Sequence, residues 1–207
     1  MTLEEAIAKI KPLDHNAMEI AQKRWDSIAK PLHSLGKLET LLIQIAGITG
    51  NAEVDLSRRG LIAMCADNGV VEEGVTQTGQ EVTAIVAENF LKYDTSVGVM
   101  CKQNHAEIFP VDMGMVTDTK VRTDHKIAYG TQNMTKGPAM TREQAVKGLE
   151  AGIDMVRELN DKGYRILATG EMGIGNTTTS TAVAAALLDL EVEQVTGKGA
   201  GLTDEAL

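Results

Sequence analysis

The apolar positions of the chain change from a helical to a strand-like spacing near residue 60. In residues 1–50 they recur every three or four positions, which predicts three helices. Pro12 and Pro31 separate these helices, and Gly50 follows the last of them. We therefore predict a helical N-terminal unit over residues 1–50.

After residue 50, short continuous apolar runs alternate with helical patterns. Such runs are typical of strands buried on both faces. Strands are predicted at 61–66, 108–111 and 165–169, with a short fourth strand at 194–196. Helices are predicted at 81–93, 97–102, 141–161 and 177–188. The helix at 81–93 is expected to face the protein interior with Val82, Ile85, Val86, Phe90 and Leu91.

Strand–helix alternation of this kind gives right-handed crossovers and a parallel sheet. The predicted fold class is therefore α/β, a three-layer and mostly parallel, Rossmann-like sheet over 51–207. Residues 118–138 are polar, lack a clear period and are predicted as a long excursion from this core.

Composition narrows the function classes. The 207 residues carry a net charge of −9, which argues against a nucleic-acid partner because such proteins need a basic face. No apolar run reaches the roughly 18–20 residues of a membrane span. The acidic start and the two widely spaced cysteines, Cys65 and Cys101, predict a cytoplasmic protein with reduced thiols. No pair of histidines has metal-ligand spacing, so no metal site is predicted.

Three predicted strands end in the same way, with an acid and a glycine after the apolar run. The acids are Asp67, Asp112 and Glu171. One Asp-Asn-Gly sequence is more often a simple turn. Three acids at the carboxyl ends of parallel strands share one rim, where ligands of such sheets bind.

The strongest local signal is the segment 170–178, Gly-Glu-Met-Gly-Ile-Gly-Asn-Thr-Thr. A glycine loop between a strand and a helix lets backbone N–H groups and the helix dipole bind an anion. The alternative is a tight strand–helix crossing with a threonine cap, and the hydroxyl run at 176–178 favours phosphate. The second glycine cluster, 197–201, is either a flexible segment or another phosphate loop, and its spacing alone favours flexibility.

Two named phosphate motifs do not fit. No segment provides the Gly-x-x-x-x-Gly-Lys-Ser/Thr pattern. The dinucleotide pattern Gly-x-Gly-x-x-Gly is incomplete because Thr178 replaces its third glycine. Glu191 lies near the distance expected of a ribose-binding acid, but no clear strand precedes it. An NAD-dependent oxidoreductase is therefore a weak alternative.

Several segments, in order along nearly the whole chain, resemble the nicotinate-nucleotide–dimethylbenzimidazole phosphoribosyltransferase family of the cobalamin lower-ligand pathway. The block 170–178 is the most specific of them. The others are 30–39 (Lys-Pro-Leu-His-Ser-Leu-Gly-Lys-Leu-Glu), 66–70 with 73–75, 82–83, 111–114 and 197–202.

The resemblance implies a reaction and its substrates. Ribose 5-phosphate moves from nicotinate mononucleotide to a benzimidazole-type base, giving α-ribazole 5′-phosphate and nicotinate. Such an enzyme needs a phosphate cradle, an apolar pocket for the flat base and a carboxylate that accepts the proton of the base. No cofactor is implied, and family members are homodimers.

The resemblance also implies roles for residues. Glu171 corresponds to a glutamate of the active site and is expected to support catalysis. Met172, Gln77 and Ile85 correspond to positions that line the base pocket. The other substrate-binding positions expected are Gly173, Ile174, Gly175, Asn176, Thr177, Gly199, Gly201, Asp67 and Asn68.

Family members continue beyond the segment that corresponds to 197–202, and their general base and a phosphate-binding lysine lie there. The resemblance therefore implies a C-terminally truncated form that lacks the main base. A positioned base contributes about 10²–10⁴ in rate, so the 207-residue chain alone is expected to be inactive or nearly so. The alternative is a non-catalytic nucleotide-binding fragment of the same fold.

Overall fold

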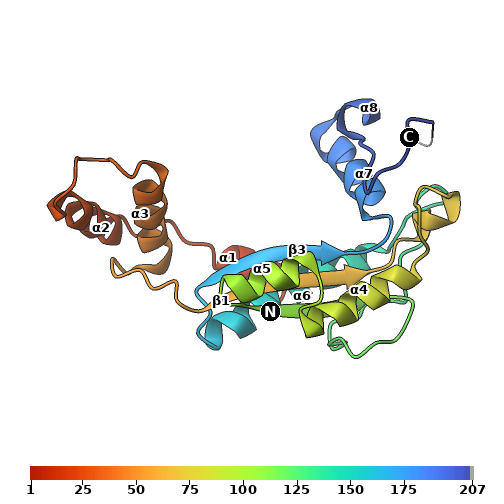
Figure 1. Ribbon diagram of the computed structural model, residues 1–207, viewed down its shortest axis with the longest axis horizontal. Helices are drawn as coiled ribbons and strands as arrows, with labels where there is room; N and C mark the ends of the chain where they lie inside the picture. Colours follow the sequence, from red (N-terminus) through yellow and green to blue (C-terminus); the bar gives the residue numbers. More distant parts are fainter. Residues whose placement is uncertain (206–207) are drawn as a thin grey trace. The chain divides into compact units, whose positions relative to one another are not determined.

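The computed structural model describes residues 1–205, which divide into two compact units. One unit is Thr2–Arg58, and the other begins at Arg59 and also includes Met1. Figure 1 shows the helices and strands of both units along the chain. Each unit is described by itself.

The unit Thr2–Arg58 contains the three predicted helices. They are α1 (Leu3–Ala8), α2 (His15–Ser27) and α3 (Lys37–Thr49). The Asp14 side chain accepts a backbone N–H in the first turn of α2, which is the usual role of an N-cap aspartate. Gly50 ends α3 in the left-handed conformation (φ 65°), which a glycine adopts without strain.

The second unit is built on three parallel strands. They are β1 (Arg59–Ala66), β2 (Ala106–Gly114) and β3 (Ile166–Met172), in the order β2-β1-β3. Pro110 pairs with Ala63 on an edge strand, where a missing N–H can face away from the ladder. All three strands were predicted, and the α/β fold class is confirmed.

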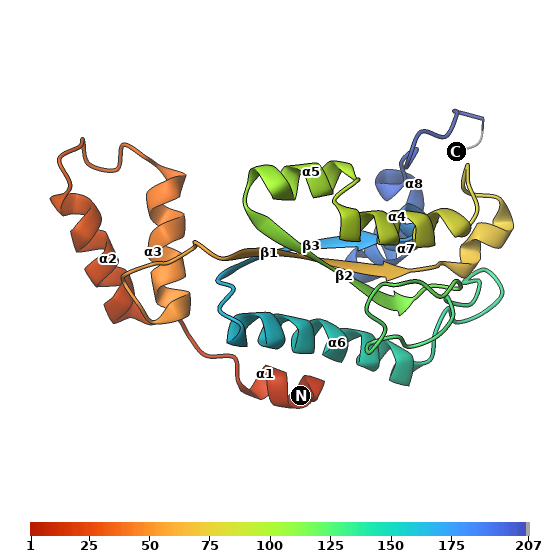
Figure 2. The ribbon, with the colours of Figure 1, turned by 60° about the horizontal axis from the view of Figure 1, so that its bottom comes forward.

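Helices cover both faces of this sheet, which gives three layers (Figure 2). α4 (Glu81–Lys92) and α5 (Ser96–Gln103) lie on one face, and α6 (Arg142–Asp161) lies on the other. Each face has its own buried cluster. Residues on the first face are Ala63, Cys65, Ala87, Phe90, Met115 and Val121, and those on the second are Ile62, Val111, Met155, Leu159 and Tyr164.

The inward face of α4 differs from the predicted one. Ile85 and Leu91 were expected inside but are 57% and 46% exposed. The buried positions are Thr83, Ala84, Ala87 and Phe90. Two alanines on the inner face allow a close approach to the sheet, which bulkier side chains would prevent.

Two strands run further than predicted. β2 continues through Asp112 to Gly114, and β3 continues through Glu171 to Met172. The register of β1 against β2 shifts between Cys65 and Ala66, so the carboxyl end of this pair contains an irregularity rather than a stop. The predicted loop at 170–176 is therefore reduced to 173–175.

The predicted strand at 194–196 is wrong. α7 (Asn176–Leu188) is followed by a short helix, α8 (Val192–Val195), beside it (Figure 1). The Thr196 hydroxyl donates to the Val192 carbonyl at 2.6 Å, which closes a helical turn. A four-residue segment held by its own turn needs no neighbouring strand.

The predicted excursion between β2 and α6 has no regular element over most of its length. Arg122 ties it to the core in two ways: its carbonyl accepts the Asp112 N–H at 2.8 Å, and its guanidinium pairs with Glu158 of α6 at 2.7 Å. Among residues 1–205, no helix combines the length and apolar character needed to cross a membrane.

Candidate functional site

The three acids predicted at the rim gather around the carboxyl end of β1. Burial first, and then the negative charges of Asp112, Glu171 and Asp67, raise the pKa of the Cys65 thiol to about 12. The Cys65 thiol therefore lies close enough to all three carboxylates for their charges to raise its pKa. Their exposures differ, however: Asp67 and Asp112 are fully buried, whereas Glu171 is exposed.

The two buried acids are held by backbone N–H groups. Asp112 accepts the N–H groups of Gly114 and Met115 at 2.9 and 2.8 Å, and Asp67 accepts that of Val116 at 2.8 Å. Burial raises the pKa of Asp67, and the Val116 N–H and the Thr83 hydroxyl oppose that rise. Both carboxylates thus lie in the interior of the rim, and the substrate-binding role of Asp67 stays a prediction.

The glycine loop between β3 and α7 is packed tightly against the end of β1. A Cβ on Gly173 would lie 2.1 Å from the Ala66 carbonyl oxygen, so only glycine fits there without a shift of the backbone. Gly175 has φ 87° and serves as the N-cap of α7. The threonine cap considered as an alternative is absent, because the N-cap residue of α7 is Gly175, which has no side chain.

Asn176 links the loop to Glu171. Its Nδ2 donates to both carboxylate oxygens of Glu171 at 2.6 Å, and its Oδ1 accepts the Thr177 N–H at 2.7 Å. Its own N–H donates to the Gly173 carbonyl at 3.0 Å. The carboxylate, the amide and the first turn of α7 therefore form one polar group at the rim.

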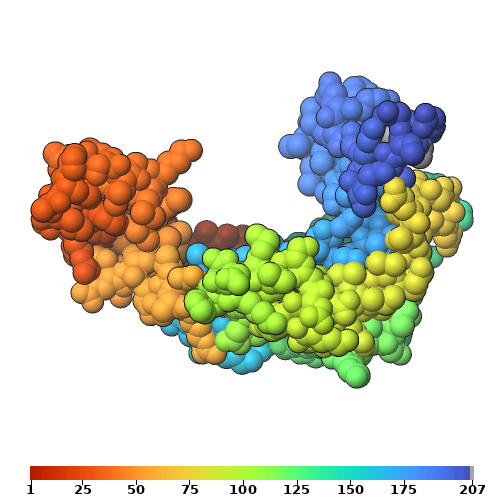
Figure 3. Space-filling model, viewed as in Figure 1, coloured from red at the N-terminus to blue at the C-terminus, as the bar shows by residue number. Residues whose placement is uncertain are grey.

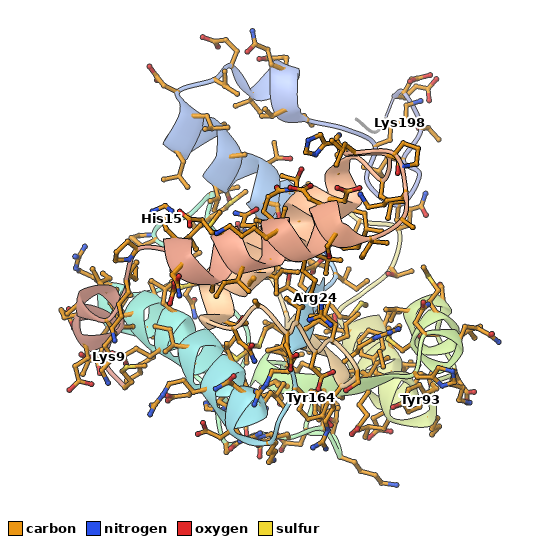
Figure 4. The ribbon with its side chains drawn as sticks, turned by 90° about the vertical axis from the view of Figure 1, so that its left-hand side faces the viewer. Lys9, His15, Arg24, Tyr93, Tyr164 and Lys198 are labelled. Carbon is orange, nitrogen blue, oxygen red and sulfur yellow. The ribbon has the colours of Figure 1, made fainter. Side chains whose placement is uncertain are left out.

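The second glycine cluster lies against the first. A Cβ on Gly199 would come within 2.9 Å of Thr177 Oγ1, and the Gly201 carbonyl accepts the Gln77 amide at 2.7 Å. Figure 3 shows this C-terminal segment in dark blue against the yellow segment that contains Gln77. Lys198, labelled in Figure 4, pairs with Asp204 at 2.5 Å. The predicted positions Gln77, Thr177, Gly199 and Gly201 are thus brought together.

Two residues that were predicted to line the base pocket, Met172 and Ile85, are not part of this polar group. Met172 packs, half-buried, against the core cluster under α4. Ile85 is on the exposed side of α4, the side opposite to Thr83 and Ala87. The role of Met172 and Ile85 in binding a base stays a prediction.

Sequence reasoning missed Thr83 as a site residue. Its side chain is fully buried, and its hydroxyl accepts the Ile174 N–H at 3.0 Å. The signal that could have revealed it is a hydroxyl residue within the resembling pair 82–83, near the start of a predicted helix. Buried hydroxyls need a partner, and here the partner is the glycine loop.

The alternative function, an NAD-dependent oxidoreductase, depended on Glu191 as a ribose-binding acid. Glu191 is the N-cap of α8 and does not end a strand, so it is not placed as a ribose-binding acid at a strand terminus. No group of three His, Cys, Asp or Glu side chains among residues 1–205 is arranged to hold a metal ion. The rim presents hydrogen-bond donors, the exposed Glu171 carboxylate and the N-terminus of α7.

A three-layer parallel sheet with a glycine loop after its third strand defines an α/β protein of the class that binds ligands at the carboxyl ends of its strands. A family model described as phosphoribosyltransferase matches residues 10–207. The chain therefore belongs to the nicotinate-nucleotide–dimethylbenzimidazole phosphoribosyltransferase family.

Relatives of that name are closely similar. The protein from Clostridium tetani is 47% identical over 205 residues, which are 98% of this chain and 57% of that protein. The protein from Ruminiclostridium cellulolyticum is 49% identical over 209 residues, with 100% and 59% covered. The crystal structure of CobT from Thermus thermophilus superposes with a TM-score of 0.84 at 36% identity, covering 92% of this chain and 58% of that one. The chain thus spans less than two thirds of these relatives.

Proposed function

We propose that this chain provides the nucleotide-binding part of a phosphoribosyltransferase that moves ribose 5-phosphate from nicotinate mononucleotide to a benzimidazole-type base. The products are α-ribazole 5′-phosphate and nicotinate. The observation that carries the proposal is the convergence of two glycine clusters, around 173–177 and 199–201, at the start of α7. Close backbone approach and a helix N-terminus are suited to a phosphate.

The proposed chemistry needs one proton transfer. A nitrogen of the base attacks the anomeric carbon of the ribose, the bond to the nicotinate nitrogen breaks, and the base loses its N–H proton to a carboxylate. Nicotinate leaves as a neutralised pyridine nitrogen, so no acid is needed to expel it. A carboxylate at the rim is therefore the main chemical requirement.

Glu171 supports this reaction without being its principal base. Both of its oxygens already accept the Asn176 amide at 2.6 Å, which lowers their availability to a substrate proton. We assign Glu171 to the orientation of Asn176 and of the helix start. The 207-residue chain by itself is then expected to bind nicotinate mononucleotide but to form product slowly or not at all.

Calorimetric titration with nicotinate mononucleotide, paired with a chromatographic product assay containing dimethylbenzimidazole, tests this proposal. We expect binding with little or no product. Asn176→Ala should weaken binding by about tenfold through the loss of charge-assisted bonds. Asn104→Ala, at the end of α5, is the matched control and should bind normally. Absence of binding would contradict the nucleotide assignment, and normal turnover would contradict the secondary role of Glu171.

We also propose a homodimer located in the cytoplasm. Apolar side chains exposed on the helical unit support association, because a large uncovered apolar surface is costly in water. They are Ile20, Ile28, Leu32, Leu35, Leu38, Leu41 and Ile48. The two cysteines without a disulfide fit a reducing compartment. Sedimentation equilibrium and cell fractionation are the measurements, and a monomer or a secreted protein would overturn the respective proposal.

A further inference from the structure

The peptide groups of Ile174 are held on both sides by side chains from distant parts of the sequence. Its N–H donates to Thr83 Oγ1 of α4 at 3.0 Å, and its carbonyl accepts Asn68 Nδ2 at 3.0 Å. These partners are 91 and 106 residues away in the sequence. Ile174 lies between Gly173 and Gly175. Hydrogen bonds to its peptide groups therefore restrict the backbone of both glycines.

Asn68, which is half-buried, makes side-chain and backbone hydrogen bonds within the protein. Its Oδ1 lies 3.1 Å from the Thr179 hydroxyl, whose single proton it shares with the Asn176 carbonyl at 3.0 Å, and its backbone carbonyl accepts the Gln80 amide at 3.1 Å. Its Nδ2 is used by the Ile174 carbonyl. Donor and acceptor sides of the carboxamide are both occupied, so its orientation is fixed by protein contacts.

Thr83 supports the loop from the other side, because its hydroxyl accepts the Ile174 N–H at 3.0 Å. Its side chain is fully buried, and the carboxyl group of Asp67 lies beside its hydroxyl. A hydroxyl has one proton and two lone pairs. One lone pair accepts the Ile174 N–H at 3.0 Å. Asp67 is itself anchored by the Val116 N–H at 2.8 Å.

We propose that Asn68 and Thr83 are positioning residues of the site, which act on the ligand only through the backbone of Ile174. This inference rests on the proposed function, because it assumes that the glycine loop binds the nucleotide. Asn68 is thereby reassigned from a substrate contact to a support. The two side chains fix the loop before a ligand arrives, and small displacements of such a loop are costly for binding and catalysis.

Thr83→Val tests the inference, because valine keeps the shape of threonine and removes the hydroxyl that accepts the Ile174 N–H. Titration with nicotinate mononucleotide should show binding weakened by about tenfold, while Thr83→Ser, which keeps the hydroxyl, should stay within about twofold. Thr119→Val is the matched control, since the Thr119 hydroxyl also accepts a backbone N–H but belongs to the excursion. Circular dichroism and thermal unfolding establish that each variant is folded at the titration temperature.

Asn68→Asp provides a second variant. It keeps an acceptor for Thr179 but replaces the donor to the Ile174 carbonyl, and it should weaken binding at least as much as Thr83→Val. Normal binding by folded Thr83→Val and Asn68→Asp would overturn the inference. Loss of binding in Thr83→Ser equal to that in Thr83→Val would also overturn it, because the hydroxyl would then not be the cause.

Hydrogen exchange of the Ile174 N–H separates this inference from the proposed function. If the unsubstituted chain fails to bind nicotinate mononucleotide, the proposed function fails. Hydrogen exchange then tests only whether the Thr83 hydroxyl holds the Ile174 N–H. Faster exchange of the Ile174 N–H in Thr83→Val than in Thr83→Ser supports the positioning role of Thr83. Equal exchange in the two variants overturns it.

Discussion

Gly173 is the residue at which backbone geometry constrains the site most strongly. The nearest atom to an added Cβ is the Ala66 carbonyl oxygen of β1, and the next is Asn68 Nδ2 at 2.9 Å. A backbone oxygen cannot move aside as a flexible side chain can. The loop is therefore close to the strand end because residue 173 has no side chain.

Gly173→Ala should lower the free energy of unfolding by about 1–3 kcal/mol, the usual cost of overpacking. It should also weaken nicotinate mononucleotide binding, because relief of the clash with Ala66 must displace the loop. Gly197→Ala is the control, since no atom lies within 4 Å of its added Cβ and its φ is not positive. Denaturant unfolding measures both variants, and equal stability of the two would contradict the packing argument.

At the scale of elements, the sequence predicted the existence of strands and helices better than their ends. β1, α6 and α7 follow from apolar runs, a Thr141 capping box and a small-residue helix, and all are present. The end of β2 was missed because Asp-Met-Gly normally breaks a strand. Here Asp112 accepts two backbone N–H groups beyond it, which stabilises the extended chain locally.

The site was predictable where its residues are consecutive and not where tertiary contacts define it. The block around Asn176 is continuous in sequence and was predicted. Thr83 was missed, and Ile85 was wrongly expected to face inward, because the face that α4 turns to the sheet depends on how closely the helix can approach. The spacing of apolar residues along the sequence does not reveal the distance between α4 and the sheet.

Glu158 of α6 holds the excursion between β2 and α6 at one of its several attachments, through its ion pair with Arg122. Arg122 first and then Lys162 lower the pKa of Glu158 from 4.5 to about 2. A carboxyl group whose pKa is lower in the folded state stabilises the fold above its unfolded pKa. That contribution decreases as the pH falls from about 4.5 towards about 2.

Glu158→Gln should therefore lower the free energy of unfolding near neutral pH, and the difference from the unsubstituted chain should shrink as the solution is acidified. Urea unfolding between about pH 6 and about pH 3 measures it. Glu143→Gln on the same helix is the control, because the Glu143–Lys147 pair is fully exposed and such pairs contribute little. A difference that is constant with pH would contradict the role of Glu158.

At the scale of the whole molecule, the charge of −9 opposes a phosphorylated ligand. Lys198, the cation of the second glycine cluster, is already paired with Asp204 at 2.5 Å. Attraction must then come from backbone and amide dipoles at the start of α7, which act over short distances. Long-range repulsion and short-range attraction respond differently to salt, because screening acts chiefly on the first.

Nicotinate mononucleotide should accordingly bind as tightly, or up to about twofold more tightly, when salt rises from about 20 to about 200 mM. A phosphate site built on lysine and arginine would show the opposite trend, because salt would screen its attraction. Nicotinate riboside, which lacks the phosphate, is the matched ligand and should show no salt dependence. Calorimetric titration at several salt concentrations gives the slope. Strong weakening with salt for the phosphorylated ligand alone would show that cationic side chains, and not the glycine-loop dipoles, hold the phosphate.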